Sequence, residues 1–201
     1  MEKLDLRKQY RALYAPPREP VLVEVPPLNY LMVDGAGDPN TSQEYAAAIE
    51  ALYGMAYTLK FMSKGSGGPD WVVPPLEGLW WVEDMASFSA GNKDTWLWTA
   101  MIMQPAAVTE QMVHAAAEQL RVKKNPPALS KLRFATLDEG LSAQVMHIGP
   151  YAEETPTIER LHAFIDQQGH ALRGKHHEIY LSDPRRTAPE KLNTVIRQPV
   201  G

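Results

Sequence analysis

The order of the predicted elements constrains the fold of this chain more than any other feature. Residues of about 21–105 are predicted to form a strand, a helix and two strands, and residues of about 131–200 repeat that order. A helix over about 109–124 connects the two stretches. Two strand-helix-strand-strand units predict a single α+β domain over residues 1–201, built by internal duplication.

Short stretches of similar sequence support this duplication. Tyr30–Gly35 resembles Gln144–Gly149 in register, and both lie in predicted strands. Leu97–Thr99 resembles Leu192–Thr194, and an apolar run ending in Gln-Pro follows each of them. We therefore expect two sheets side by side, with helices on one sheet face and a ligand groove on the opposite face along the pseudo-twofold axis.

Capping and turn residues mark the ends of several elements. Thr41 and Glu44 match a capping box, in which each side chain satisfies a free amide of the other residue. Thr155, followed by proline in the first turn, is predicted to be the N-cap of another helix. Asp138–Gly140 separates two β-type runs, which are therefore expected to pair as a hairpin over 132–148.

The composition excludes several classes of function. Twenty Lys and Arg against 24 Asp and Glu give a net charge of −4 with no basic cluster, which argues against a nucleic-acid partner. The absence of Cys excludes disulfides, thiolate zinc sites and cysteine nucleophiles. The charged opening Met1–Lys8 is not a signal peptide, and no apolar run approaches the ~20 residues that cross a bilayer. A cytoplasmic protein with no membrane contact is expected.

The familiar metal, phosphate and nucleophile motifs are missing from the sequence. His176 and His177 are neighbours in a predicted strand, so they point to opposite faces and cannot easily share one ion. Gly35–Gly37 and Lys64–Gly68 lack the spacing of dinucleotide and phosphate loops, and there is no serine-hydrolase elbow. We expect no metal and no cofactor. Any chemistry must come from carboxylate, tyrosine, histidine and bound water.

One predicted strand near the end of the chain carries the main candidate residues. Alternate side chains of a strand share a face, so His176, Glu178 and Tyr180 point together, while His177 and Ile179 point to the helix-covered core. If the first face is the groove, Glu178 is a carboxylate among aromatic residues, which takes a raised pKa or seeks a cation or donor. The alternative is an ordinary exposed face with a structural hydrogen bond from Tyr180.

Aromatic residues on other elements are candidates for the groove wall. Two tryptophans share a face of one predicted strand, and either Trp80 or Trp81 joins them from the next strand. Two tyrosines one helical turn apart are placed at the rim. The candidate lining residues are Trp81, Trp96, Trp98, Tyr53 and Tyr57. Simple core packing is the alternative for each of them.

Four stretches resemble the GyrI-like (gyrase-inhibitor-like) small-molecule-binding family. They are Val21–Tyr30, His147–Pro156, Gly174–Pro184 and Pro189–Val200. The resemblance spans essentially the whole chain, and the motif around Glu178 is its most specific part. It implies two strand-helix-strand-strand units with a groove between them. It also implies a likeness to effector domains of multidrug-responsive transcription factors, in which a groove carboxylate at the position of Glu178 receives cationic aromatic drugs.

The resemblance extends to catalysis. Some stand-alone members of the family hydrolyse cyclopropane-bearing alkylating toxins, which makes Trp98, Tyr57 and Glu178 candidate groove residues for that reaction. No helix-turn-helix region precedes the two units in this sequence. A transcriptional role is therefore not expected.

Two functions fit these residues. The leading hypothesis is binding of amphipathic aromatic molecules, cationic ones included, for sequestration or detoxification, with Trp96 and Trp98 stacking on the rings and Glu178 supplying the countercharge. The alternative is a cofactor-independent hydrolase that opens a strained ring, with Glu178 as general base and Tyr180 or His176 serving the leaving oxygen. Both need the same pocket, so the sequence does not decide between them. A protein-inhibitor role rests on analogy alone, and no protein partner is expected.

Overall fold

The computed structural model describes residues 3–83 and 93–201 of the chain. Within them, eight strands form one antiparallel sheet in the order β1-β6-β8-β7-β3-β4-β2-β5. The strands are β1 (Val21–Val25), β2 (Leu28–Ala36), β3 (Glu77–Trp81), β4 (Leu97–Gln104), β5 (Arg133–Leu137), β6 (Gly140–Ile148), β7 (His176–Tyr180) and β8 (Asn193–Pro199). The α-helices are α1 (Leu6–Gln9), α2 (Arg11–Tyr14), α3 (Gln43–Gly65), α4 (Glu110–Lys123) and α5 (Thr155–Gln167). The 3-10 helices are η2 (Lys93–Thr95), η3 (Pro127–Lys131), η4 (Tyr151–Glu153) and η5 (Pro189–Lys191).

The strand order is symmetric about the junction between β7 and β3. On one side of this junction the sheet continues through β8 and β6, and on the other side through β4 and β2. The edge strands are exchanged, because β1 pairs with β6 and β5 pairs with β2. The predicted hairpin over 132–148 is therefore wrong. Both edges of β6 are occupied by β1 and β8, so β5 pairs with the free edge of β2 instead.

The starts of helices α3 and α5 differ in detail from the predicted caps. Ser42, one residue after the predicted cap, begins α3 by accepting a hydrogen bond from the amide of Tyr45 at 3.2 Å. Glu44 is ion-paired with Lys131 of η3, so the predicted capping box is wrong. In α5 the N-cap is Glu154, so the prediction of Thr155 as the cap is wrong by one residue, although the proline lies in the first turn as predicted.

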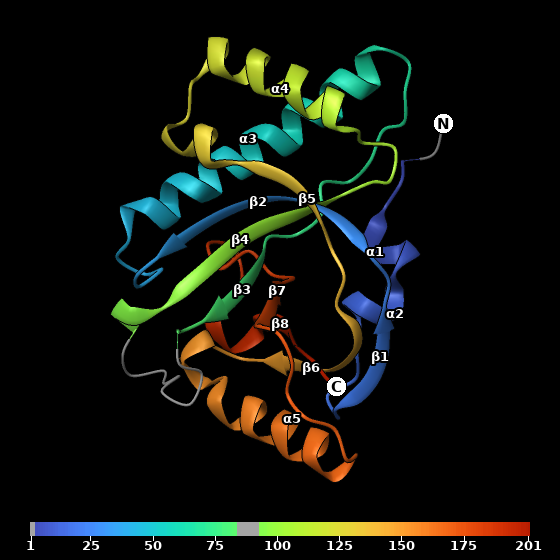
Figure 1. The fold of residues 1–201 in the computed structure, drawn as a ribbon, viewed down its shortest axis with the longest axis vertical. Coiled ribbons are helices and arrows are strands. Elements are labelled where there is room, and N and C mark those ends of the chain that lie inside the picture. The colour runs from blue at the N-terminus through green and yellow to red at the C-terminus, as the bar shows by residue number, and fades with distance from the viewer. Residues whose placement is uncertain (1–2, 84–92) are drawn as a thin grey trace.

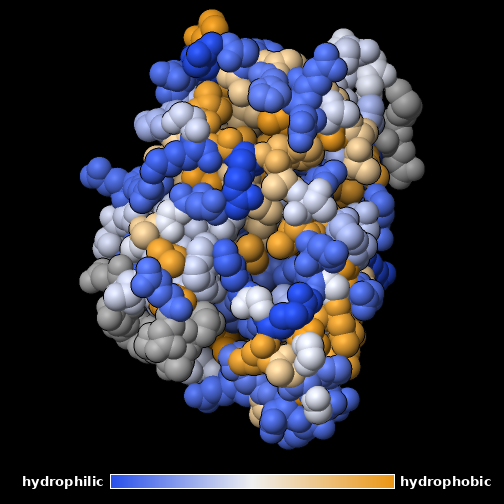
Figure 2. Space-filling view, viewed as in Figure 1, coloured by the Kyte–Doolittle hydropathy of each residue, from blue (hydrophilic) through white to orange (hydrophobic). Residues whose placement is uncertain are grey.

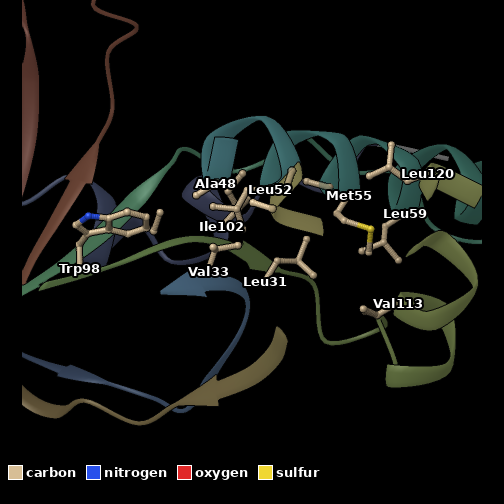
Figure 3. Packing of buried hydrophobic residues seen from close by; sticks show 14 of the residues in the cluster. Leu31, Val33, Ala48, Leu52, Met55, Leu59, Trp98, Ile102, Val113 and Leu120 are labelled. Atoms are coloured by element: carbon tan, nitrogen blue, oxygen red, sulfur yellow. The ribbon is translucent and has the colours of Figure 1, made fainter. Parts of the chain in front are cut away.

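Helix α3 covers β2 and β4 with a continuous apolar stripe. Its side chains, among them Leu52 and Met55, pack on Leu31 and Ile102, which face each other in the β2–β4 register (Figure 3). Helix α4 packs on the outer side of α3 through residues such as Leu120. The core of this half therefore has three layers, with α3 packed between the sheet and α4.

Helix α5 covers the other half of the same sheet face. Its Leu161 and Ile165 pack on Val145 of β6 and Ile196 of β8. Figure 1 shows α3 and α4 at one end of the molecule and α5 at the other, with the sheet between them. The strands at the centre of the sheet, β3 and β7, thus lie between the two helical layers.

The opposite face of the sheet is covered by the N-terminal segment. Leu6 of α1 and Leu13 of α2 pack with Met101 of β4 and Ile179 of β7 in a second buried cluster. On the surface drawn in Figure 2, hydrophobic residues are interspersed with hydrophilic ones. Among the helices described, none combines the length and apolar character needed to span a membrane.

Candidate functional site

A cavity of about 830 Å³ lies over β3 and β7, in the space between α3 and α5. Its aromatic lining residues are Tyr45, Tyr53 and Tyr57 of α3, Trp80 of β3, Trp96, Tyr151 of η4 and Tyr180 of β7. Three residues with carboxyl groups, Glu154, Glu178 and Asp183, also line it, as do the basic residues Arg7, Lys93 and Arg185. The size and the combination of aromatic walls with charged groups are typical of a small-molecule site.

The cavity lies on the helix-covered face, which corrects the predicted position of the groove. The alternation along β7 was predicted correctly, since His176, Glu178 and Tyr180 line the cavity and Ile179 is buried on the other side. The assignment of the faces was reversed. Helix α3 covers β2 and β4, and α5 covers β6 and β8, so the two helices leave the centre of this face open. Helices α1 and α2 cover the other face.

Glu178 is held by two neighbours on its own strand. The hydroxyl of Tyr180 donates to its Oε2 at 2.7 Å, and Nε2 of His176 lies 3.1 Å from its Oε1. Because an ionised carboxylate can only accept, this Nε2 carries the hydrogen. The hydroxyl of Tyr180 in turn accepts from Nε1 of Trp80 at 3.0 Å, so a chain of hydrogen bonds crosses from β3 to β7.

A glycine makes room for this chain. Gly78 pairs with Glu178 across the β3–β7 junction, and the indole of Trp80 lies over its backbone. A Cβ at Gly78 would meet Nε1 of Trp80 at 2.8 Å, closer than real Cβ atoms approach. The indole can therefore reach Tyr180 only because residue 78 has no side chain.

The hydrogen bonds keep Glu178 ionised inside the aromatic cavity. Its side chain is 12% exposed, and burial by itself raises the pKa of this carboxyl. The hydrogen bonds and charge of His176, the hydrogen bond of Tyr180 and the charge of Lys93 outweigh burial and lower the pKa below its usual value. At neutral pH Glu178 is therefore an ionised carboxylate that is positioned before any ligand arrives.

Glu154, directly before α5, behaves in the opposite way. Only 5% of this residue is exposed, and burial together with the charge of Glu178 raises the pKa of its carboxyl to about 9. At neutral pH Glu178 is thus an ionised carboxylate, whereas Glu154 is a protonated carboxylic acid. Two carboxyl groups whose pKa values are pushed apart are typical of ligand and catalytic sites.

The aromatic side chains form continuous walls. The rings of Trp80 and Trp96 lie 5.5 Å apart, and Tyr45 lies 5.7 Å from Trp80 on the helix side. The ammonium group of Lys93 lies 5.2 Å above the Trp96 ring. At the mouth, Tyr53 and Tyr57 are stacked with their rings 6.5 Å apart.

Two of the predicted lining residues do not reach the cavity. Trp98 is fully buried beneath α3, where its ring makes an edge contact with Tyr45 at 4.9 Å. Trp81 points to the opposite side of β3, where Lys175 lies 3.1 Å from its ring centre. Strand alternation therefore places Trp80, and not Trp81, at the cavity.

The other predicted site residues all lie at the cavity, together with residues that were not predicted from the sequence. The predicted residues that line the cavity are Tyr53, Tyr57, Trp96, His176, Glu178 and Tyr180. The additional ones include Tyr45, Tyr151 and Glu154. The available signal for Glu154 was the pair of glutamates directly before the predicted start of α5, in one of the stretches that resemble the GyrI-like family.

A buried network of charged groups lies directly behind the cavity. His177, which follows His176 on β7, has Nδ1 3.0 Å from Glu139 and Nε2 3.0 Å from Glu77 of β3. Arg197 of β8 donates to the same Glu139 at 3.1 Å. The network crosses the β3–β7 junction on the face opposite to Glu178. Over residues 3–83 and 93–201, no three His, Asp or Glu side chains are grouped so as to hold a metal ion.

The sequence matches the model of the GyrI-like small molecule binding domain over residues 18–200. The chain belongs to the GyrI-like family. Comparison with curated proteins finds no match.

Solved structures from Listeria innocua are similar over the full length of this GyrI-like chain. One, described as a conserved protein, has 43% identity and a TM-score of 0.94, covering 99% of this chain and 100% of its own. Another, described as a hydrolase, has 43% identity and a TM-score of 0.90, covering 100% of both chains. The C-terminal domain of EcmrR, at 13% identity, shares the fold with a TM-score of 0.58, covering 91% of this chain and 97% of its own.

Proposed function

We propose that the protein binds planar aromatic cations in the cavity between α3 and α5, with Glu178 as the countercharge. The observation that carries this proposal is the ionised carboxylate of Glu178, fixed by Tyr180 and His176 inside an aromatic cavity. The biological role that fits such a site is sequestration or detoxification. The symmetric strand order supports the further proposal that the two units arose by duplication and that the cavity lies on their pseudo-twofold axis.

The cavity supplies both contributions that a planar cation needs. A cation over an aromatic face gains roughly 0.5–2 kcal/mol, and the rings of Trp80 and Trp96 border the carboxylate. The attraction between a positive charge of the ligand and the Glu178 carboxylate contributes roughly 2 kcal/mol at a separation of about 8 Å and an effective dielectric constant of about 20. Because Glu178 is already held in place, the ligand does not have to order it on binding.

A pair of probes with one shape and two charges tests the proposal. N-methylacridinium and 9-methylanthracene differ by a positive charge at the same ring position, and quenching of Trp80 and Trp96 fluorescence reports their binding. We expect Glu178→Gln to weaken the binding of N-methylacridinium by about 10- to 100-fold, which corresponds to the loss of roughly 1.4–2.7 kcal/mol of attraction between the two charges. Binding of 9-methylanthracene should stay nearly unchanged. Glu153→Gln, at an exposed position, is the matched control. Equal weakening of both probes by Glu178→Gln is the result that rules out the charge role.

A second candidate function is hydrolysis in the same cavity. Two Listeria innocua structures of 43% and 42% identity are described as hydrolases, which favours this candidate. Glu178 would take a proton from water, and the water oxygen would attack a cyclopropane carbon conjugated to a carbonyl. The carbon–carbon bond then breaks, its electron pair moves to the carbonyl oxygen, and that oxygen takes a proton, with Tyr180 and His176 as the nearby donors.

Mass spectrometry separates the two candidates. A cyclopropane-bearing dienone recovered unchanged after incubation supports binding alone. A ring-opened product that has gained one water, and that is lost with Glu178→Gln, supports hydrolysis.

A further inference from the structure

Glu154 is a buried polar group that the proposed charge contact does not use. It lies directly before α5, it lines the cavity, and only 5% of it is exposed. Its Oε1 is completely buried and has no hydrogen-bond partner among the residues that the structure describes. It does not cap the helix that it precedes, since its side chain accepts no amide hydrogen bond there. Buried polar groups are usually hydrogen-bonded, so a carboxyl group with an unpartnered oxygen at a cavity indicates that its partner is a ligand.

The charges around Glu154 determine its protonation state. Burial and the negative charge of Glu178 on β7 raise the pKa of Glu154 to about 9. The Thr194 hydroxyl on β8 and the ammonium of Lys93 act in the opposite direction, as does the amino end of α5. Burial and Glu178 outweigh them, so the group is a neutral carboxylic acid at pH 7. A neutral carboxylic acid has one O–H donor, which an ionised carboxylate lacks.

We propose that Glu154 donates a hydrogen bond to a carbonyl oxygen of the ligand, so that the cavity selects planar aromatic molecules that carry such an acceptor. The inference rests on the proposed function and names the chemical class of its ligand more closely. The cavity then has two polar contacts of different kinds, an anion at Glu178 for a cationic group and an acid at Glu154 for an acceptor oxygen. A site built to donate a hydrogen bond discriminates against molecules that leave its donor unpaired.

A doubly cationic ligand fits the two carboxyl groups less well. A dication would need both Glu154 and Glu178 ionised, and the negative charge of Glu178 disfavours the ionisation of Glu154. Removing the proton from a group with a pKa of about 9 reduces the affinity for a dication at pH 7 by about 100-fold. A ligand with one cationic group and one acceptor oxygen can bind while Glu178 is ionised and Glu154 is protonated, which are their states at pH 7.

The test uses fluorenone and fluorene, two planar tricyclic molecules that differ only in a carbonyl in place of a methylene group. In the wild-type protein we expect fluorenone to bind about tenfold more tightly. With Glu154→Leu, which removes the donor, the two affinities should become equal, whereas Glu154→Gln keeps an N–H donor and should retain most of the preference. Glu153→Gln should leave it unchanged. A preference in Glu154→Leu equal to that of the wild type would overturn the proposal.

Infrared spectroscopy gives a second readout that does not depend on the Leu variant being folded. The carbonyl stretch of bound fluorenone should move to lower frequency in the wild type and in Glu154→Gln, because a donor contacts the oxygen. A stretch in the wild type that matches fluorenone in an apolar solvent would also overturn the proposal.

The two proposals can fail separately. Glu178→Gln should remove the preference for N-methylacridinium over 9-methylanthracene and leave the fluorenone preference intact. Glu154→Leu should remove the preference for fluorenone over fluorene and leave the preference for N-methylacridinium intact. A wild-type protein that prefers fluorenone but not the cation would contradict the proposed charge role and support the acceptor contact.

Discussion

The buried network around His177 makes the stability of the protein depend on pH in a specific way. The imidazole lies between Glu77 and Glu139, with 3.0 Å from each ring nitrogen to a carboxylate oxygen. Arg197 is the second cation, so two positive and two negative charges balance where no water reaches. A neutral imidazole would leave this group with an uncompensated buried negative charge.

The size of the effect follows from the shift in pKa. Although burial alone lowers the pKa of His177, Glu139 and Glu77 raise it from 6.5 to about 9. A group whose pKa is higher in the folded state stabilises fully below its unfolded value, and that stabilisation is lost as the pH rises through the folded value. His177 should therefore account for a loss of about 3 kcal/mol in the free energy of unfolding between pH 6 and pH 9. Glu154, whose pKa is also raised to about 9, should account for about 3–4 kcal/mol more, so we expect a total loss of about 6–7 kcal/mol.

Urea unfolding at pH 6, 7.5 and 9 measures this loss. At a denaturant dependence of roughly 3 kcal/mol per molar, the urea midpoint of the wild type should fall by about 2 M. His177→Gln should be less stable at pH 6, by about 3–5 kcal/mol, because it leaves a buried carboxylate unpaired. Its loss of stability between pH 6 and pH 9 should be about 3 kcal/mol smaller than that of the wild type, because only the Glu154 contribution remains. The exposed His114→Gln is the control. A wild-type stability that is constant from pH 6 to pH 9 would refute a charged His177, and the refutation needs no variant.

Two substitutions test the hydrogen-bond chain that positions Glu178. Tyr180→Phe removes the donor at 2.7 Å, so the pKa of Glu178 should rise by about 1–2 units in a carboxyl NMR titration; no rise, or an equal rise with Tyr151→Phe, would contradict the role of the hydroxyl. Gly78→Ala places a Cβ 2.8 Å from Nε1 of Trp80, and we expect a loss of about 1–3 kcal/mol in unfolding free energy and weaker binding of N-methylacridinium. Gly65→Ala, where a Cβ meets nothing within 4 Å, is its control, and equal effects at both positions would argue against the close approach.

The alternation of side chains on β7 could be predicted from the sequence, but the face of the sheet could not. A period of two places Glu178 and Tyr180 together in any strand. Which of the two faces holds the cavity depends on how much of the sheet α3 and α5 cover, and on the position of α1 and α2. The positions of these helices depend on contacts between elements that are far apart in the sequence, and a local sequence pattern does not predict such contacts.

The same limit explains the errors at Trp98 and in the predicted hairpin. Trp98 shares a face with the cavity residues, but Tyr45 of α3 lies against its ring and closes that part of the face. Strands β5 and β6 follow one another in sequence, which favours a hairpin, yet β6 already has two partners. In both cases a long-range contact overrides an assignment that is locally reasonable.

The cavity depends on contacts between the two halves of the sheet, because neither half contains it alone. Trp80 comes from β3, whereas Glu178 and Tyr180 come from β7, and the Trp80–Tyr180 hydrogen bond crosses the junction on the cavity side. The His177–Glu77 pair crosses the same junction on the other side. Tyr180 and His177, both on β7, thus hold the junction from opposite faces. The symmetric sheet places the Glu178 carboxylate where both halves contribute, and the buried ion pairs behind it keep that carboxylate in register with the aromatic wall.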